Sequence, residues 1–292
     1  MRWFFDKMCN VLIAIRGGVL FPLIVTASLC VCGLFFVLYF ISRLIPGKPA
    51  RAFFVKKFIL LYRVFWGVVR LFFSLHCEFE FIGSQATKRL NRNSNYIMIS
   101  NHQSWLDVFF IAGYLQPRLS PIKFFMKRDL LWQLPFASWY CYLNGFPFLR
   151  RKANSRDKDA QSIKDACSIL HASPGTLMIF LEGTRFSVMK QERLKSHYQH
   201  LLNPKSYGLA NSLYFLQNSL DGIIDCTVVY TEKNKSVVDF ILGRVKRVEI
   251  HGELIPLGEQ LVGDYQNDLD FKQGFKRWLQ QLWQEKEDLL NQ

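Results

Sequence analysis

The sequence predicts an α/β domain that follows an N-terminal region of membrane helices. Two observations carry this prediction. A long uncharged apolar run lies near the N-terminus, and after about residue 78 short apolar runs alternate with helical or loop stretches. Strands that alternate with helices are typical of an α/β sheet. We therefore divide the chain into a membrane-anchoring helical region, residues 1–77, and an α/β domain, residues 78–292.

The apolar run extends from Gly17 to Ser42 between Arg16 and Arg43. As a helix it would be about 39 Å long, enough to cross a hydrocarbon core of roughly 30 Å. A buried core helix would usually show a polar face, and a cleaved signal peptide would have a shorter apolar region. Basic residues lie on both sides and are more numerous after the run, which favours a cytoplasmic C-terminal side. A hairpin that enters and returns stays open as the alternative.

A second apolar stretch, Phe58 to Leu75, is interrupted by Arg63 and Arg70. The spacing of seven residues puts both arginines near one face of a helix. This pattern predicts a helix that lies in the membrane interface or packs under the first one, with a plain core helix as the alternative.

The remainder of the chain contains the elements of the predicted sheet. Strands are expected at Tyr96–Ser100, Ile122–Met126, Phe146–Leu149, Thr176–Leu181, Ile223–Tyr230, Val237–Leu242 and Val248–Leu254. Helices are expected at Ser104–Tyr114, Ser155–Leu170 and Leu209–Asn218, and an amphipathic helix at Gln266–Leu290.

The composition limits the possible partners and cofactors. The formal net charge is +14 and 15% of the residues are aromatic, a combination that suits an anionic membrane surface. Charge alone also allows a nucleic-acid partner, but no basic helix or aromatic platform of the usual kinds is present. The seven cysteines form no CxxC pair and no zinc-type cluster, so we expect neither a disulfide framework nor a structural metal.

The segment from Tyr96 to Asp107 combines a strand, a short polar turn and the start of an apolar helix. A helix cap explains Ser104 and Asp107, since these residues have the spacing of a capping box. It does not explain His102, which lies at the carboxyl end of a strand, where open α/β sheets place their sites. If Asp107 accepts a hydrogen bond from one ring nitrogen of His102, the other nitrogen can take a proton from a hydroxyl. We therefore interpret His102 and Asp107 as a catalytic base and the group that orients it.

Two further strand ends carry arginine. The strand from Thr176 runs into Glu182-Gly-Thr-Arg185, where Gly183 permits a tight turn and Arg185 can hold an anionic oxygen in a forked contact. Taken alone, this motif is better explained as a strand-terminal turn with a solvated arginine. The stretch from Gly145 to Arg151 likewise ends in paired arginines.

Together these motifs resemble the glycerophospholipid acyltransferase family, the PlsC-like 1-acylglycerol-3-phosphate O-acyltransferases. The family's Asn-His-x-x-x-x-Asp block is matched by residues 101–107 and its Glu-Gly-Thr-Arg block by residues 182–185. The Gly-x-x-Phe-Ile-Asp-Arg block is matched by Gly145, Phe148 and Arg151, with Leu149 and Arg150 as departures. The proline usual in the fourth block is absent, so no residue is carried over from it. The C-terminal stretch is similar to an enterobacterial subgroup, the YihG-like acyltransferases.

The resemblance implies a mixed sheet flanked by helices and a membrane-bound enzyme without metal or cofactor. The implied reaction transfers an acyl group from acyl-CoA or acyl carrier protein to the hydroxyl of a lysophospholipid, above all lysophosphatidic acid. The implied catalytic residues are His102 and Asp107. The implied substrate-binding residues are Arg151, Glu182, Gly183, Thr184 and Arg185. The implied location is a bacterial inner membrane, with the active site on the cytoplasmic side.

Two other classes of function were weighed against acyl transfer. One is a basic membrane-associated regulator that binds nucleic acid or a protein on a retained acyltransferase fold. The intact His/Asp and Glu-Gly-Thr-Arg groups argue against it. The other is an esterase with Ser104 or Ser187 as nucleophile, for which the sequence offers no Gly-x-Ser-x-Gly elbow.

Overall fold

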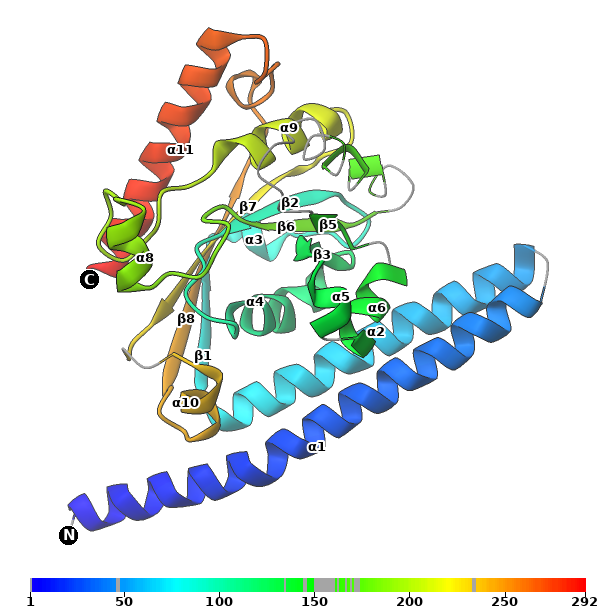
Figure 1. Cartoon of the computed structure of the whole chain (residues 1–292), viewed down its shortest axis with the longest axis vertical. Coiled ribbons are helices and arrows are strands. Elements are labelled where there is room, and N and C mark those ends of the chain that lie inside the picture. Colours follow the sequence, from blue (N-terminus) through cyan, green and yellow to red (C-terminus); the bar gives the residue numbers. More distant parts are fainter. Residues whose placement is uncertain are drawn as a thin grey trace.

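The protein is built around a mixed six-stranded sheet with the order β1-β8-β7-β2-β6-β3 (Figure 1). The computed structural model describes residues 2–45, 48–133, 135–143, 146–149, 161, 163–165, 167–168, 170, 174–232 and 235–292. The strands are β1 (Glu78–Gly83), β2 (Tyr96–Ser100), β3 (Ile122–Phe124), β6 (Thr176–Phe180), β7 (Gly222–Tyr230) and β8 (Arg247–Ile255). Strands β7, β2, β6 and β3 are parallel, whereas β8 runs antiparallel to β7 and parallel to β1. Two short strands, β4 (Met126–Lys127) and β5 (Phe148–Leu149), pair separately.

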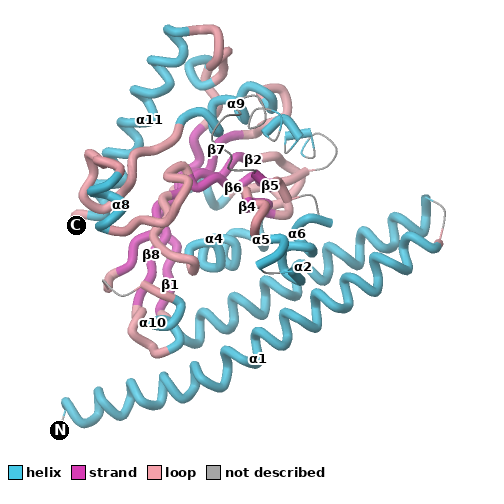
Figure 2. Tube along the Cα trace, viewed as in Figure 1, coloured by secondary structure: helices cyan, strands magenta, loops and turns pink. Residues whose placement is uncertain are grey.

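Helices surround the strands (Figure 2). They are α1 (Arg2–Leu44), α2 (Lys48–His76), α3 (Gln85–Lys88), α4 (Asp107–Leu115), α5 (Leu130–Gln133), α6 (Pro135–Leu143), α8 (Val188–Arg193), α9 (Ser206–Leu216), α10 (Val237–Ile241) and α11 (Leu269–Leu290). Short 3₁₀ turns cover Gln116–Arg118 and Glu259–Leu261.

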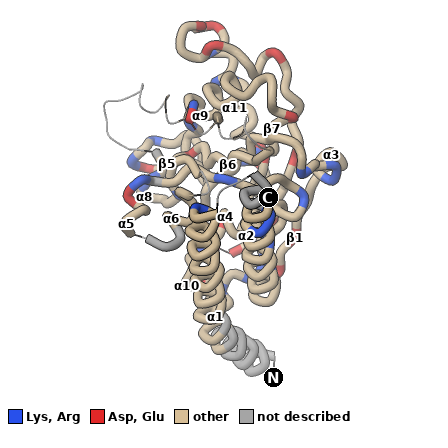
Figure 3. Tube along the Cα trace, turned by 90° about the vertical axis from the view of Figure 1, so that its right-hand side faces the viewer, with Lys and Arg blue, Asp and Glu red and all other residues tan. Residues whose placement is uncertain are grey.

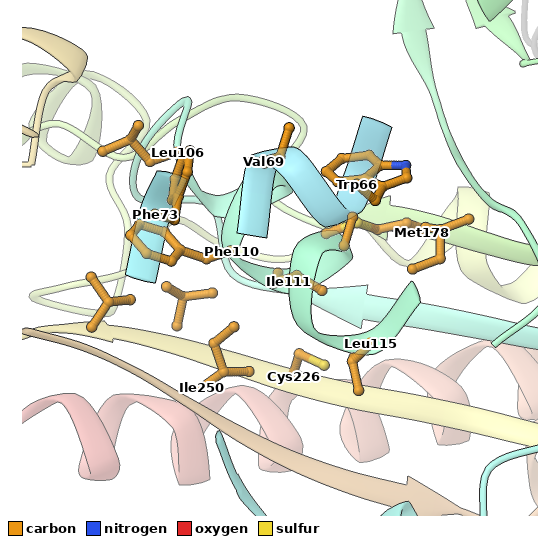
Figure 4. Packing of buried hydrophobic residues seen from close by; sticks show 14 of the residues in the cluster. Trp66, Val69, Phe73, Leu106, Phe110, Ile111, Leu115, Met178, Cys226 and Ile250 are labelled. Atoms are coloured by element: carbon orange, nitrogen blue, oxygen red, sulfur yellow. The ribbon is translucent and has the colours of Figure 1, made fainter. Parts of the chain in front are cut away.

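Each face of the sheet has its own hydrophobic core, because successive strand residues point to opposite sides. Met98 of β2 belongs to the core formed with α2 and α4, and its neighbours Ile97 and Ile99 belong to the core formed with α9 and α11. Figure 4 shows the first core, in which Trp66 and Phe73 of α2 lie with side chains of α4 and the strands. The two cores give the domain three layers and fix the carboxyl ends of β2, β6 and β7 at one edge.

Helices α1 and α2 are each long and apolar enough to cross a membrane, over Gly17–Leu44 and Lys56–His76. Between Gly17 and Ser42, α1 has no charged residue (Figure 3) and exposes many apolar side chains, such as Leu23 and Phe40. One face of α2 is buried on α4, and the opposite face exposes further apolar residues, including Leu60 and Leu71. The second apolar stretch is therefore both a core helix and an exposed apolar surface.

Most of the expected elements are present, but one is wrong and several were missed, among them helices α3, α5, α6 and α8. Val237–Leu242 was expected to be a strand, but Val237–Ile241 forms helix α10. Its start is fixed by a capping box, in which the Ser236 hydroxyl accepts from Asp239 N and the Asp239 carboxylate accepts from Ser236 N. Strand β1 was not predicted. The helix expected at Ser155–Leu170 lies largely outside the described residues.

Candidate active site

The carboxyl end of β2 is fastened to its neighbour by Asn101. The Asn101 amide donates to the carbonyl of Val228 at 3.0 Å, and its side-chain oxygen accepts from Val228 N at 2.8 Å. The buried side chain of Asn101 thus extends the hydrogen bonding between β2 and β7 by one residue. This anchor fixes where the chain turns away from the sheet, and His102 is the next residue.

The structure brings His102 and Asp107 together across the turn. His102 Nδ1 lies 2.9 Å from Asp107 Oδ2, and Asp107 is fully buried while His102 is 16% exposed. The same carboxylate oxygen accepts from the backbone N–H groups of Gln103 and Ser104 at 2.7 and 2.9 Å. The imidazole also stacks on Phe180 at the end of β6, with the ring centroids 4.0 Å apart. With Nδ1–H donating to Asp107, Nε2 is the nitrogen available to accept a proton.

Tyr230 is a further partner of Asp107, and no sequence motif pointed to this residue. Its hydroxyl donates to Asp107 Oδ1 at 2.6 Å from the end of β7. Burial raises the pKa of Tyr230, and the charge of Asp107 raises it further, so the phenol keeps the proton that it donates. The only signal in the sequence was a tyrosine as the last residue of an apolar strand, the same topological position as the other site residues.

Glu182 holds the turn from the other side. Its side-chain oxygens accept from His102 N at 2.8 Å and from Leu202 N at 3.0 Å, and the residue is 1% exposed. Burial raises the pKa of Glu182 to about 8, although both backbone hydrogen bonds lower it. The sequence led us to expect a substrate contact, whereas the contacts in the structure give Glu182 the task of positioning the backbone of His102.

Gly183 makes the sharp turn after β6 possible. Its φ is +68°, a region that side chains of L-residues rarely occupy. A Cβ at this position would also lie only 2.9 Å from Nζ of Lys205. The positive φ is therefore what requires glycine here, because the flexible end of the Lys205 side chain can shift away.

The next two residues of this turn are Thr184 and the cationic Arg185. Lys190 donates to the Thr184 hydroxyl at 2.9 Å and to the Arg185 carbonyl at 2.8 Å, which fixes the turn onto α8. The Arg185 guanidinium lies over the ring of Trp105, 4.6 Å from its centroid. Trp105 is 48% exposed and lies between His102 and Asp107 in the sequence, so the stacked guanidinium is placed beside the turn that carries these two residues. The sequence analysis did not single out Trp105 or Lys190.

Arg151, the remaining predicted substrate-binding residue, and Gly145 of the same block lie outside the described residues. Ser104, the nucleophile of the esterase alternative, is 4% exposed. Its hydroxyl donates to the carbonyl of Lys235 and accepts from Leu106 N, so it is occupied by backbone contacts. The Ser104 hydroxyl does not accept from Asp107 N, so of the expected capping box the structure shows the half in which the Asp107 carboxylate accepts from Ser104 N.

A histidine oriented by a buried carboxylate, at the strand ends of an α/β sheet and next to a cationic turn, is typical of enzymes that deprotonate a hydroxyl group during group transfer. The family comparison is specific. The family model described as Acyltransferase matches residues 81–282, and the chain belongs to this family.

Among curated relatives, the chain is 27% identical over 219 residues to 1-acyl-sn-glycerol-3-phosphate acyltransferase epsilon of Mus musculus, covering 67% of this chain and 57% of that protein. It is 26% identical to a probable 1-acyl-sn-glycerol-3-phosphate acyltransferase 5 of Arabidopsis thaliana, covering 78% and 68%. The chain thus spans between about half and two thirds of the length of such relatives. A crystal structure of the 1-acyl-sn-glycerophosphate acyltransferase PlsC from Thermotoga maritima has the same fold, with a TM-score of 0.52, 16% identity and coverage of 94% and 97%.

Proposed function

We propose that this protein transfers a fatty acyl group from a thioester, acyl-CoA or acyl carrier protein, to the free hydroxyl of a lysophospholipid, with lysophosphatidic acid as the main acceptor and phosphatidic acid as the product. The observation that carries the proposal is the contact of 2.9 Å between His102 Nδ1 and Asp107 Oδ2 beside the Arg185 turn. Relatives named 1-acyl-sn-glycerol-3-phosphate acyltransferases support the substrate class.

In the proposed reaction, His102 Nε2 removes the proton of the acceptor hydroxyl as its oxygen attacks the thioester carbonyl carbon. A C–O bond forms, the C–S bond then breaks, and the thiolate leaves with the proton returned by the imidazolium. Asp107 stabilises the charged ring while it exists. A thiolate is a good leaving group, so the reaction needs neither a covalent intermediate nor a metal or cofactor.

Arg185 is placed to hold the phosphate of the acceptor, with Arg151 as the second cation that the family motif implies. A guanidinium presents paired donors that match phosphate oxygens. Fixing the phosphate orients the acceptor hydroxyl toward His102, and orientation of this kind supplies much of the rate of a two-substrate reaction. Gly183 and Thr184 shape the turn that presents Arg185.

Helices α1 and α2 support a membrane location. Exposed apolar residues along α1, including Leu23 at 58% and Phe40 at 64%, form an apolar surface of the kind that contacts a membrane or another protein. We propose that this hairpin anchors the enzyme in a bacterial inner membrane with the active site on the cytoplasmic side, where a lipid acceptor can enter from the bilayer. We also propose membership of the enterobacterial YihG-like subgroup, on the C-terminal sequence similarity.

The test is mass spectrometry of the products that the detergent-purified protein makes from a panel of lysophospholipids and acyl donors. We expect the acceptor mass to increase by one acyl group with wild-type protein and not with His102→Ala. His197→Ala, which changes an exposed histidine, is the matched control and should keep full activity. Full activity of His102→Ala would refute the proposed mechanism. Salt-dependent binding of RNA without any acyl transfer would favour the regulatory alternative.

A further inference from the structure

The side chain of Gln103, directly after the catalytic histidine, is held at both ends. Its amide nitrogen donates to the carbonyl of His200 at 2.8 Å, and its amide oxygen accepts from the ammonium group of Lys235. Gln103 is 6% exposed. Because both ends of the amide have partners, the side chain cannot rotate without losing a buried hydrogen bond.

Lys235 also contacts the next residue of the turn. Its backbone carbonyl accepts from the hydroxyl of Ser104. The backbone N–H groups of Gln103 and Ser104 donate to Asp107, so this turn is held by Asp107 on one side and by Lys235 on the other. Lys235 lies in the segment between β7 and α10, more than a hundred residues away in the sequence.

The ammonium group of Lys235 is also a charge within the site. It is half-buried, 5.6 Å from the centroid of the Phe186 ring and 6.0 Å from that of Tyr230. Burial lowers the pKa of Lys235, while the charge of Asp107 raises it. A cation in this place offsets the negative charge of a carboxylate that is fully removed from water.

We propose that Lys235 is a positioning residue for acyl transfer, which holds Gln103 and the turn beneath it so that His102 stays aligned with the acceptor hydroxyl. This inference rests on the proposed function. Lys235 acts through Gln103 and does not bind substrate, so its loss should change the rate of the chemical step and leave acceptor binding almost unchanged.

The test compares Lys235→Met, Lys235→Arg and the control Lys276→Met, an exposed lysine on α11, in acyl transfer to lysophosphatidic acid. We expect Lys235→Met to lower kcat at least tenfold with less than a threefold change in the KM of the acceptor. Lys235→Arg should restore most of the rate because it keeps both charge and donor. Lys235→Gln, which keeps a donor without the charge, replaces the Met variant if that one does not fold.

A double-mutant cycle with Gln103→Leu separates positioning from a general loss of stability. If Lys235 acts through Gln103, Lys235→Met should have little further effect on kcat in the Gln103→Leu background. Independent, multiplicative losses would overturn the proposal, as would wild-type kcat in Lys235→Met. A raised KM with unchanged kcat would also overturn it and make Lys235 a substrate contact. Wild-type protein that is inactive with every donor and acceptor would instead refute the proposed function.

Discussion

The buried carboxyl group of Glu182 makes the stability of this protein depend on pH in a predictable way. Burial raises its pKa to about 8 in the folded protein, from an ordinary value of 4.5. Between these values the unfolded chain has lost the proton and the folded protein retains it. The folded state then binds more protons, so the free energy of unfolding falls as pH rises, by up to about 1.4 kcal/mol per pH unit.

The substitution Glu182→Gln removes this dependence. Between pH 5.5 and 7.0 the wild-type protein should lose about 2 kcal/mol of stability through Glu182, whereas glutamine does not titrate. Glutamine also presents an NH₂ group to one of two backbone donors, His102 N or Leu202 N, and leaves that donor without an acceptor. This mismatch costs about 1–3 kcal/mol at every pH. We therefore expect the stability of the wild-type protein to fall by about 2 kcal/mol relative to that of Glu182→Gln between pH 5.5 and 7.0.

The assay is denaturant unfolding in a mild detergent at pH 5.5, 6.25 and 7.0, followed by the circular dichroism of the helices. Glu285→Gln on the exposed side of α11 is the control, because it removes a carboxylate that is not buried. Its pH profile should run parallel to that of the wild type. If the profiles of the wild type and Glu182→Gln also ran parallel, the protonated state assigned to Glu182 would be wrong.

Three further substitutions test the site. Tyr230→Phe removes the hydroxyl that donates to Asp107 at 2.6 Å. The substitution should lower the free energy of unfolding by about 1.5–3 kcal/mol, and should lower kcat with little change in the KM of the acceptor. Unchanged stability and rate would contradict the role of the hydroxyl. In steady-state kinetics, Arg185→Ala should raise the KM for lysophosphatidic acid about 10- to 100-fold, and should raise the KM for an acceptor without phosphate only slightly. Equal effects on both acceptors would exclude a phosphate contact. Gly183→Ala places a side chain on a residue with φ +68° beside Lys205. It should lower the free energy of unfolding by about 1–2 kcal/mol, as measured by denaturant unfolding. Wild-type stability of this variant would show that the turn relaxes easily.

The sequence was sufficient for the part of the site that is local in the chain. His102 and Asp107 lie five residues apart, at the junction of a strand with a polar turn, so one short segment contained both the base and its carboxylate. Tyr230 reaches the same turn from the end of β7 and Lys235 from the segment after it, and only the order of the strands brings them there. No local pattern could show that contact.

The role of a motif residue was harder to predict than its position. The Glu-Gly-Thr-Arg segment was located correctly at the end of β6, but the direction of the Glu182 side chain depends on Leu202, which donates from a separate loop. Helix α10 failed for a related reason. Its five residues are mostly β-branched or aromatic and favour a strand, yet a capping box at Ser236 outweighs that preference over so short a segment.

The buried carboxyl groups of Asp107 and Glu182, on either side of the His102 turn, differ in their hydrogen-bond partners. This difference explains why Asp107 is the one that accepts from the imidazole. Asp107 accepts from the imidazole, from two backbone N–H groups and from Tyr230, and Lys235 supplies a nearby positive charge. Among the described residues Glu182 accepts from two backbone N–H groups, and burial raises its pKa to about 8, so it keeps its proton at neutral pH. One negative charge therefore faces His102 when the ring takes up a proton. In the proposed mechanism Asp107 stabilises the imidazolium, while Glu182 holds the backbone in place without adding a second charge.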